Sequence, residues 1–74
     1  MSIAHWASKG ARWEAILDRI EDGYRLSERK HGKEAGASFR PFAQIPDDEN
    51  AKTYFAHQVA LGFDVPMKRV GYTK

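Results

Sequence analysis

The sequence predicts a small α+β fold, an α/β two-layer arrangement in which two helices pack on one face of a short two-stranded sheet. Three observations lead to this prediction. They are a long segment with apolar residues at helical spacing, a strong helix-entry motif later in the chain, and two short segments that alternate as strands do. The order of the elements is helix, strand, helix, strand, so the second helix would connect the two strands.

The first predicted helix runs from about Ser8 to about Arg29. Its apolar residues recur at spacings that place them on one stripe of a helix: Trp13, Ile16, Leu17, Ile20 and Tyr24. Ser8 can cap the first turn, and Gly10 weakens an earlier start. Acidic residues come early in this segment and basic residues come late, which suits the helix dipole.

Residues 30–38 lose this periodicity and predict a loop that contains two glycines. The order of glycine, lysine and serine differs from that of a phosphate-binding loop, so we predict no nucleotide site there. The segment from Ser38 to Ile45 alternates as a strand, and Pro41 places it at an edge of the sheet. Arg40 and Phe42 would then lie on the sheet face that the helices leave exposed.

A proline followed by three acidic residues predicts the second helix, with Asp47 or Asp48 as its N-cap. This helix is expected to reach Leu61 and to stop at Gly62. The last segment, Val65 to Tyr72, is predicted to be the second strand. Because a two-stranded sheet is only marginally stable by itself, this fold favours docking on a partner or dimerisation.

The length and composition of the chain exclude several classes of protein. The chain has 74 residues, which predicts a single domain over residues 1–74. It has no cysteine, which excludes disulfides and cysteine-based zinc sites and fits a cytoplasmic protein, and it has no apolar run long enough to span a membrane. The net charge of +2 is too small to indicate a dedicated nucleic-acid binder. The charges nevertheless alternate in blocks, with residues 23–46 and 65–74 basic and residues 1–22 and 47–64 acidic.

No catalytic, cofactor-binding or metal-binding motif is present. The three histidines, His5, His31 and His57, are far apart and lack the spacing of metal ligands. The acidic residues from Asp47 to Glu49 are explained as a helix cap. A chain of this length also has difficulty enclosing a substrate pocket of roughly 300 Å³ or more. We therefore predict a protein that is not an enzyme and uses no cofactor or metal.

These observations favour a protein-binding module. We expect an inhibitor or adaptor that blocks a surface of a larger protein or nucleoprotein complex, and homodimerisation is a further option. Small size without cysteines or catalytic motifs is a profile shared with phage and other mobile-element inhibitors, including anti-CRISPR proteins.

The alternative is a small nucleic-acid-binding protein that uses the basic loop and the basic C-terminal strand. The residues expected to contact a partner are basic or aromatic, because Arg and the aromatic residues anchor many interfaces and basic residues also neutralise phosphates. They are Arg29, Lys30, Lys33, Arg40, Phe42, Lys68, Arg69 and Tyr72.

Overall fold

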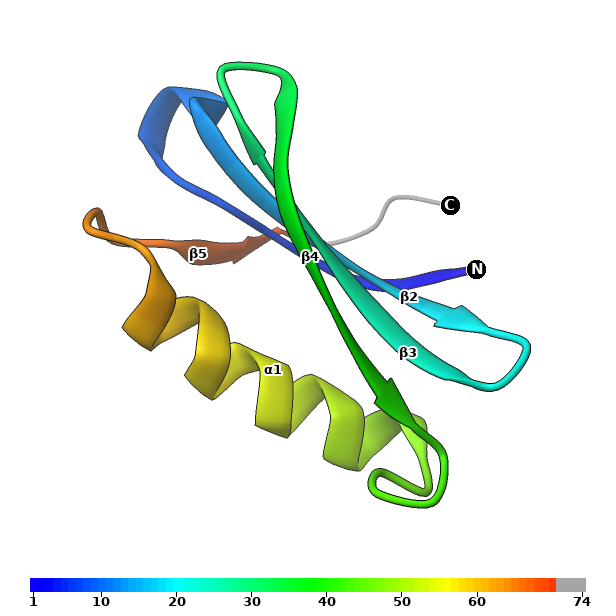
Figure 1. The fold of residues 1–74 in the computed structure, drawn as a ribbon. Coiled ribbons are helices and arrows are strands. Elements are labelled where there is room, and N and C mark those ends of the chain that lie inside the picture. The colour runs from blue at the N-terminus through cyan, green and yellow to red at the C-terminus, as the bar shows by residue number, and fades with distance from the viewer. Residues whose placement is uncertain (71–74) are drawn as a thin grey trace.

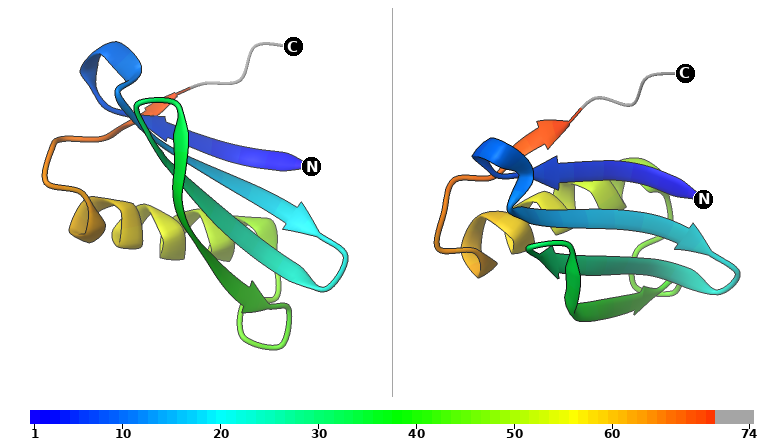
Figure 2. Two further views of the ribbon diagram at one scale, coloured as in Figure 1. Left: turned by 45° about the horizontal axis from the view of Figure 1, so that its top comes forward. Right: turned by 90° about the horizontal axis from the view of Figure 1, so that it is seen from above.

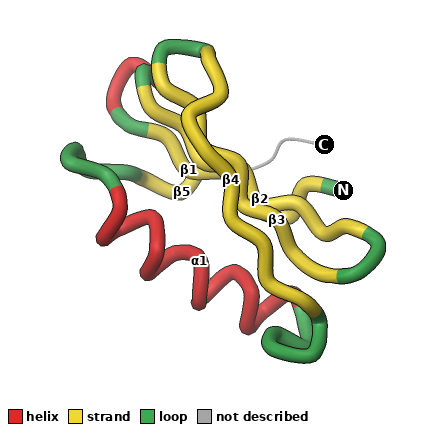
Figure 3. The backbone as a smooth tube through the Cα atoms, viewed as in Figure 1, coloured by secondary structure: helices red, strands yellow, loops and turns green. Residues whose placement is uncertain are grey.

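The computed structural model describes residues 1–70, which form a five-stranded antiparallel sheet with one α-helix packed on one face (Figure 1). The elements in chain order are β1 (Ser2–Ala7), the short 3₁₀ helix η1 (Lys9–Ala11), β2 (Trp13–Ile20), β3 (Gly23–Lys30), β4 (Lys33–Pro41), α1 (Asp48–Gly62) and β5 (Lys68–Val70). The strand order is β4-β3-β2-β1-β5, and every neighbouring pair is antiparallel. Figure 3 shows how the strands alternate with short turns before the chain enters α1.

The predicted fold class and the predicted first helix are wrong. Residues 13–30 form β2 and β3, joined by a tight turn at Glu21 and Asp22. Ala15 and Leu17 are fully buried, whereas Ile20 on the opposite face is 36% exposed. This alternation has the period of two that a half-buried strand requires. The sheet therefore has five strands and carries one α-helix, in place of two strands and two helices.

The core lies between the sheet and α1. Leu17 lies opposite Leu26 on β3 and opposite Ala4 on β1, so three neighbouring strands present apolar side chains at one level. The helix meets them with three residues spaced one turn apart, Ala51, Phe55 and Val59, all buried. Each fully buried large apolar side chain of this kind contributes roughly 1.5–3 kcal/mol to stability.

The helix itself agrees with the sequence prediction. Asp47 is the N-cap, and one carboxylate oxygen of Asp47 accepts a hydrogen bond of 2.8 Å from the backbone N–H of Asn50. The helix ends at Gly62. Leu61, however, is 83% exposed and does not join the apolar face of α1. Within residues 1–70, no helix has both the length and the apolar character needed to cross a membrane.

The remaining predictions hold only in part. The strand predicted over residues 38–45 overlaps the end of β4, while the loop predicted over residues 30–38 contains a tight turn and most of β4. Pro41 does end an edge strand, as its missing N–H predicts. The predicted last strand is reduced to β5, and Tyr72 lies outside the described residues.

Two glycines shape the β3–β4 hairpin. His31 and Gly32 form its two-residue turn with φ of 55° and 80°, which is the pattern of a type I′ turn. Gly23, at the other end of β3, lies so close to β4 that a Cβ atom would come within 2.3 Å of the Arg40 carbonyl oxygen and 2.8 Å of the Pro41 Cα. A side chain at position 23 therefore cannot be accommodated without moving β4.

Gly23→Ala should lower the free energy of unfolding by roughly 1–3 kcal/mol, because the new methyl group overpacks a backbone contact. Chemical denaturation checks this value. Gly62→Ala is the matched control, since nothing lies within 4 Å of a Cβ at position 62. Equal stability of the two variants would contradict the close approach of β3 and β4.

Candidate functional site

The turns at the two ends of the antiparallel sheet differ in charge. The η1 turn and the β3–β4 turn lie at one end, and the β2–β3 turn lies at the other (Figure 1). The loop after α1 returns to the first end, because Lys68 at the start of β5 pairs with Ala7 at the end of β1. Glu21 and Asp22 occupy the opposite turn, where the acidic entry to α1 also lies. Figure 2 shows the same arrangement from two further directions.

Six exposed cations gather at the first end, which we call the basic end. They come from the η1 turn, the β3–β4 hairpin and the start of β5, and they are Lys9, Arg12, Arg29, Lys30, Lys33 and Lys68. The two turns touch directly, since the His31 N–H donates a 2.7 Å hydrogen bond to the Arg12 carbonyl oxygen. Segments far apart in the sequence are thus joined into one basic surface.

The cations of the basic end differ from Arg19, Arg25 and Lys52 in their partners. Within residues 1–70, none of these six forms an ion pair within 4.0 Å. By contrast, Arg19 pairs with Asp48, Arg25 with Glu34, and Lys52 with Glu49. Arg40 and Arg69 also form no ion pair, but each lies over an aromatic ring. Most of the described cations without an ion pair are therefore at one end of the sheet.

An aromatic residue lies among these cations. The Lys30 ammonium lies over the Trp13 ring, 4.7 Å from the ring centroid. The Phe63 ring meets the Trp13 ring edge-on, with 5.6 Å between the two centroids. The Trp13 backbone N–H donates a 3.1 Å hydrogen bond to the Ser8 hydroxyl. Trp13 also lines an open cleft of about 890 Å³ between the η1 turn and the loop that leads into β5.

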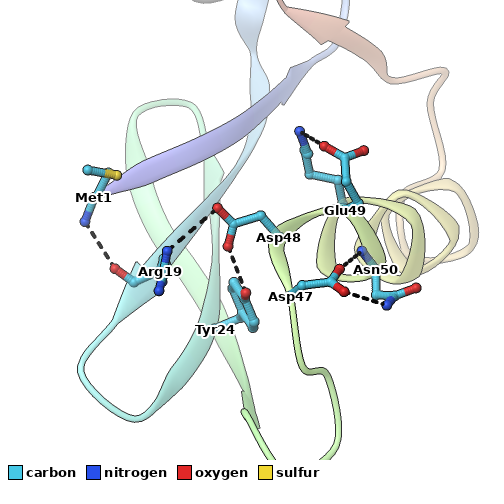
Figure 4. A network of polar contacts seen from close by, with 8 residues as sticks. Met1, Arg19, Tyr24, Asp47, Asp48, Glu49 and Asn50 are labelled. Atoms are coloured by element: carbon cyan, nitrogen blue, oxygen red, sulfur yellow. Dashed lines mark hydrogen bonds and ion pairs between the residues drawn. The ribbon is translucent and has the colours of Figure 1, made fainter.

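The acidic end contains a polar network that anchors α1 to the sheet (Figure 4). The Tyr24 hydroxyl donates a 2.7 Å hydrogen bond to one carboxylate oxygen of Asp48, and the other oxygen lies 3.9 Å from the Arg19 guanidinium. The terminal amine of Met1 donates to the Arg19 carbonyl oxygen. The network joins the first helical residue to β2, β3 and the N-terminus, which is sufficient to explain it structurally.

Burial raises the pKa of Tyr24 to about 12, and the hydrogen bond to Asp48 and its negative charge act in the same direction. The Tyr24 hydroxyl is therefore a neutral donor at ordinary pH. Its contribution to stability is complete below pH 10, where the phenol is protonated in both the folded and the unfolded chain. The contribution is lost between about pH 10 and 12, because the unfolded chain releases the proton first.

The structure separates the eight predicted contact residues into groups. Arg29, Lys30, Lys33 and Lys68 all lie at the basic end. Arg69 lies on the helix side of β5, with its guanidinium 5.7 Å from the Trp6 ring centroid.

The prediction that Arg40 and Phe42 lie on the exposed sheet face, away from the helix, is wrong. Arg40 donates a 3.1 Å hydrogen bond to the Tyr54 hydroxyl on α1. Phe42 is half-buried and meets the Tyr24 ring edge-on at 5.3 Å. Arg40 therefore helps to attach α1 to the sheet, and Phe42 packs against the hydrophobic core.

Sequence reasoning missed Lys9, Arg12 and Trp13 as members of this site. All three were assigned to a helix, where they would be separated from residues 29–33 by several turns. The signal that could have shown the correct structure is the Glu21-Asp22-Gly23 segment, which is typical of a hairpin turn when apolar alternation flanks it.

Two further observations concern the site. Within residues 1–70, no group of three or more His, Asp or Glu side chains is arranged to hold a metal ion. Comparison with protein-family models, with curated proteins and with solved structures finds no match for this chain.

Tyr24→Phe should lower the free energy of unfolding by about 1–2 kcal/mol at pH 7, because the buried hydrogen bond to Asp48 is lost. It should also remove a loss of stability that the parent protein shows between about pH 10 and 12. Denaturation at a series of pH values checks both effects. Tyr54→Phe, which keeps Tyr24, should retain the alkaline loss. An identical alkaline loss in Tyr24→Phe would contradict the assignment.

Proposed function

We propose that this chain is a non-enzymatic binding module whose basic end binds the phosphate backbone of nucleic acid in the cytoplasm. The observation that supports this function best is the set of six exposed cations without internal acidic partners. Each Lys or Arg that neutralises a phosphate releases counterions condensed on the nucleic acid, and a cation without an acidic partner does so without first breaking an ion pair. The basic end thus holds six of the described cations that form no ion pair within 4.0 Å.

The low net charge of +2 does not weigh against this proposal. The molecule extends over 34 Å in its longest direction. At physiological ionic strength the Debye length is about 8 Å, so exposed charges at opposite ends are largely screened from each other. A phosphate near the basic end is therefore attracted by the local cations and only weakly repelled by the distant acidic end. Glu14 and Glu34, which lie opposite Arg29 on the neighbouring strands, offset part of this attraction.

If all six cations contact phosphates, the binding constant should depend steeply on salt concentration. The logarithm of the binding constant should fall with the logarithm of salt concentration with a slope of about −5 for duplex DNA. Fluorescence anisotropy of labelled oligonucleotides between about 50 and 200 mM salt gives this slope. Absence of binding to both duplex and single-stranded oligonucleotides at the lowest salt would contradict the proposal.

The double variant Arg12→Gln with Lys33→Gln should weaken binding about tenfold or more at low salt and make the slope shallower by about two, because two phosphate contacts are lost. The matched control is Gln44→Glu with Thr53→Glu. It lowers the net charge by the same amount at two exposed positions outside the basic end. Equal weakening in both double variants would show that net charge, and not the basic end, governs binding.

A second candidate function is the expected inhibitor or adaptor that docks on a larger protein. The observation in its favour is the sheet face opposite α1, where Ile20 and Phe39 are 36% and 41% exposed and lie on either side of Gly23. Exposed apolar groups of this kind are typical of protein contacts. The proposed association with phage or anti-CRISPR proteins stays a prediction that no finding tests.

Phe39→Glu should abolish stoichiometric capture of a protein partner while leaving nucleic-acid binding unchanged, since Phe39 lies on the open sheet face and outside the basic end. Affinity purification with the parent chain and the variant checks this outcome. Recovery of the same stoichiometric partner by both proteins, or by neither, would count against docking through this face.

A further inference from the structure

The cleft beside Trp13 combines an apolar floor with a cationic rim. Its apolar lining includes Trp13, Val65, Pro66 and Val70. Lys9, Arg12 and Lys68 also line it, and no acidic residue does. A ligand that fits this lining has a flat apolar part and an attached negative charge.

The Trp13 ring is held in place before any ligand arrives. Lys30 covers the ring at 4.7 Å, Phe63 meets it at an interplanar angle of 85°, and Ser8 fixes the backbone of Trp13 by hydrogen bonds in both directions. A fixed aromatic ring loses little conformational freedom on binding, which favours affinity. Trp13 is only half-buried and lines the cleft, so a second flat ring can pack against the part of its side chain that these contacts leave exposed.

The size of the cleft and its opening to solvent also restrict the kind of ligand that can bind there. About 890 Å³ falls within the range of roughly 300–1,000 Å³ that is usual for ligand pockets. The cleft opens to solvent at the basic end, between the η1 turn and the residues before β5. A segment of a longer polymer can enter such a cleft while its remaining phosphates stay on the neighbouring cations.

We propose that this cleft binds an unpaired nucleobase, stacked on Trp13, with its adjacent phosphate held by Lys9, Arg12 or Lys68. This inference rests on the proposed nucleic-acid function and specifies its substrate. Bases inside a duplex are already stacked and paired, so only single strands or overhanging ends can fill the cleft. The basic end holds the phosphate backbone, and the cleft selects nucleic acid with unpaired bases.

The proposal is tested by comparing three duplexes of equal length with the unaltered protein. One is blunt, one carries a three-nucleotide overhang, and one carries the same overhang with abasic sugars in place of the bases. The normal overhang should improve binding by roughly 5- to 150-fold, the range expected for one base stacked on an aromatic ring. The abasic overhang should bind like the blunt duplex, because its phosphates are present but its bases are missing.

A protein variant supplies the second test. Trp13→Leu keeps apolar bulk next to Phe63 and should remove the preference for the overhang, so that the overhanging and the blunt duplex bind this variant with equal affinity. Arg29→Gln is the control at the basic end, because Arg29 does not line the cleft. It should weaken all three duplexes equally. Circular dichroism confirms that each variant is folded.

The outcomes separate this inference from the function on which it rests. If the blunt and the overhanging duplex bind equally, the base-binding cleft is overturned and the proposal for the basic end stands. The same holds if the abasic overhang improves binding over the blunt duplex as much as the normal overhang does. Failure of every oligonucleotide to bind overturns both proposals. If the folded Trp13→Leu variant still binds the overhanging duplex more tightly than the blunt one, the claim that the base stacks on Trp13 is overturned.

Discussion

Antiparallel pairing of strands that follow one another in the chain places successive turns at alternate ends of the sheet. In this molecule the constraint determines where the charges lie. The η1 turn and the β3–β4 turn must share an end, and the β2–β3 turn must lie at the other. The first two turns are basic and the third is acidic, so cations from separate parts of the chain meet at one end of the sheet.

The helix α1 spans the distance between the two ends (Figure 1). Its acidic N-terminus begins at the acidic end, where Asp48 accepts from Tyr24 and lies near Arg19. Carboxylates at this position also suit the positive end of the helix dipole. Its C-terminus reaches the basic end, where Phe63 supports the Trp13 ring. The network at one end holds the helix in place, and the other end keeps its cations free.

Part of this structure could be predicted from local sequence. The N-cap of α1 at Asp47, its end at Gly62 and the edge position of Pro41 follow from local chemistry, and the structure confirms them. The first helix was predicted wrongly because Ile16 and Leu17 are adjacent apolar residues, which a helical stripe accommodates easily. In the sheet they lie on opposite faces, since Leu17 is buried under α1 and Ile16 belongs to the open face.

The site was predictable only where its residues are close in sequence. Arg29, Lys30 and Lys33 belong to one hairpin, so their proximity was visible, but Lys9 and Arg12 join them through cross-strand pairing that no local pattern reports. Arg40 and Phe42 were misplaced for the same reason. Which face of an edge strand is covered depends on where α1 crosses the sheet, and that is a property of the whole fold.

The most direct test of the central claim is a chemical-shift map of the backbone amides of the labelled protein during titration with an oligonucleotide that carries unpaired bases. The claim predicts perturbations confined to residues 8–13, 29–33 and 65–70. Amides at the acidic end, residues 21–22 and 46–50, should stay unchanged. Perturbations centred on the acidic end or on the open sheet face, or none at saturating oligonucleotide, would contradict it.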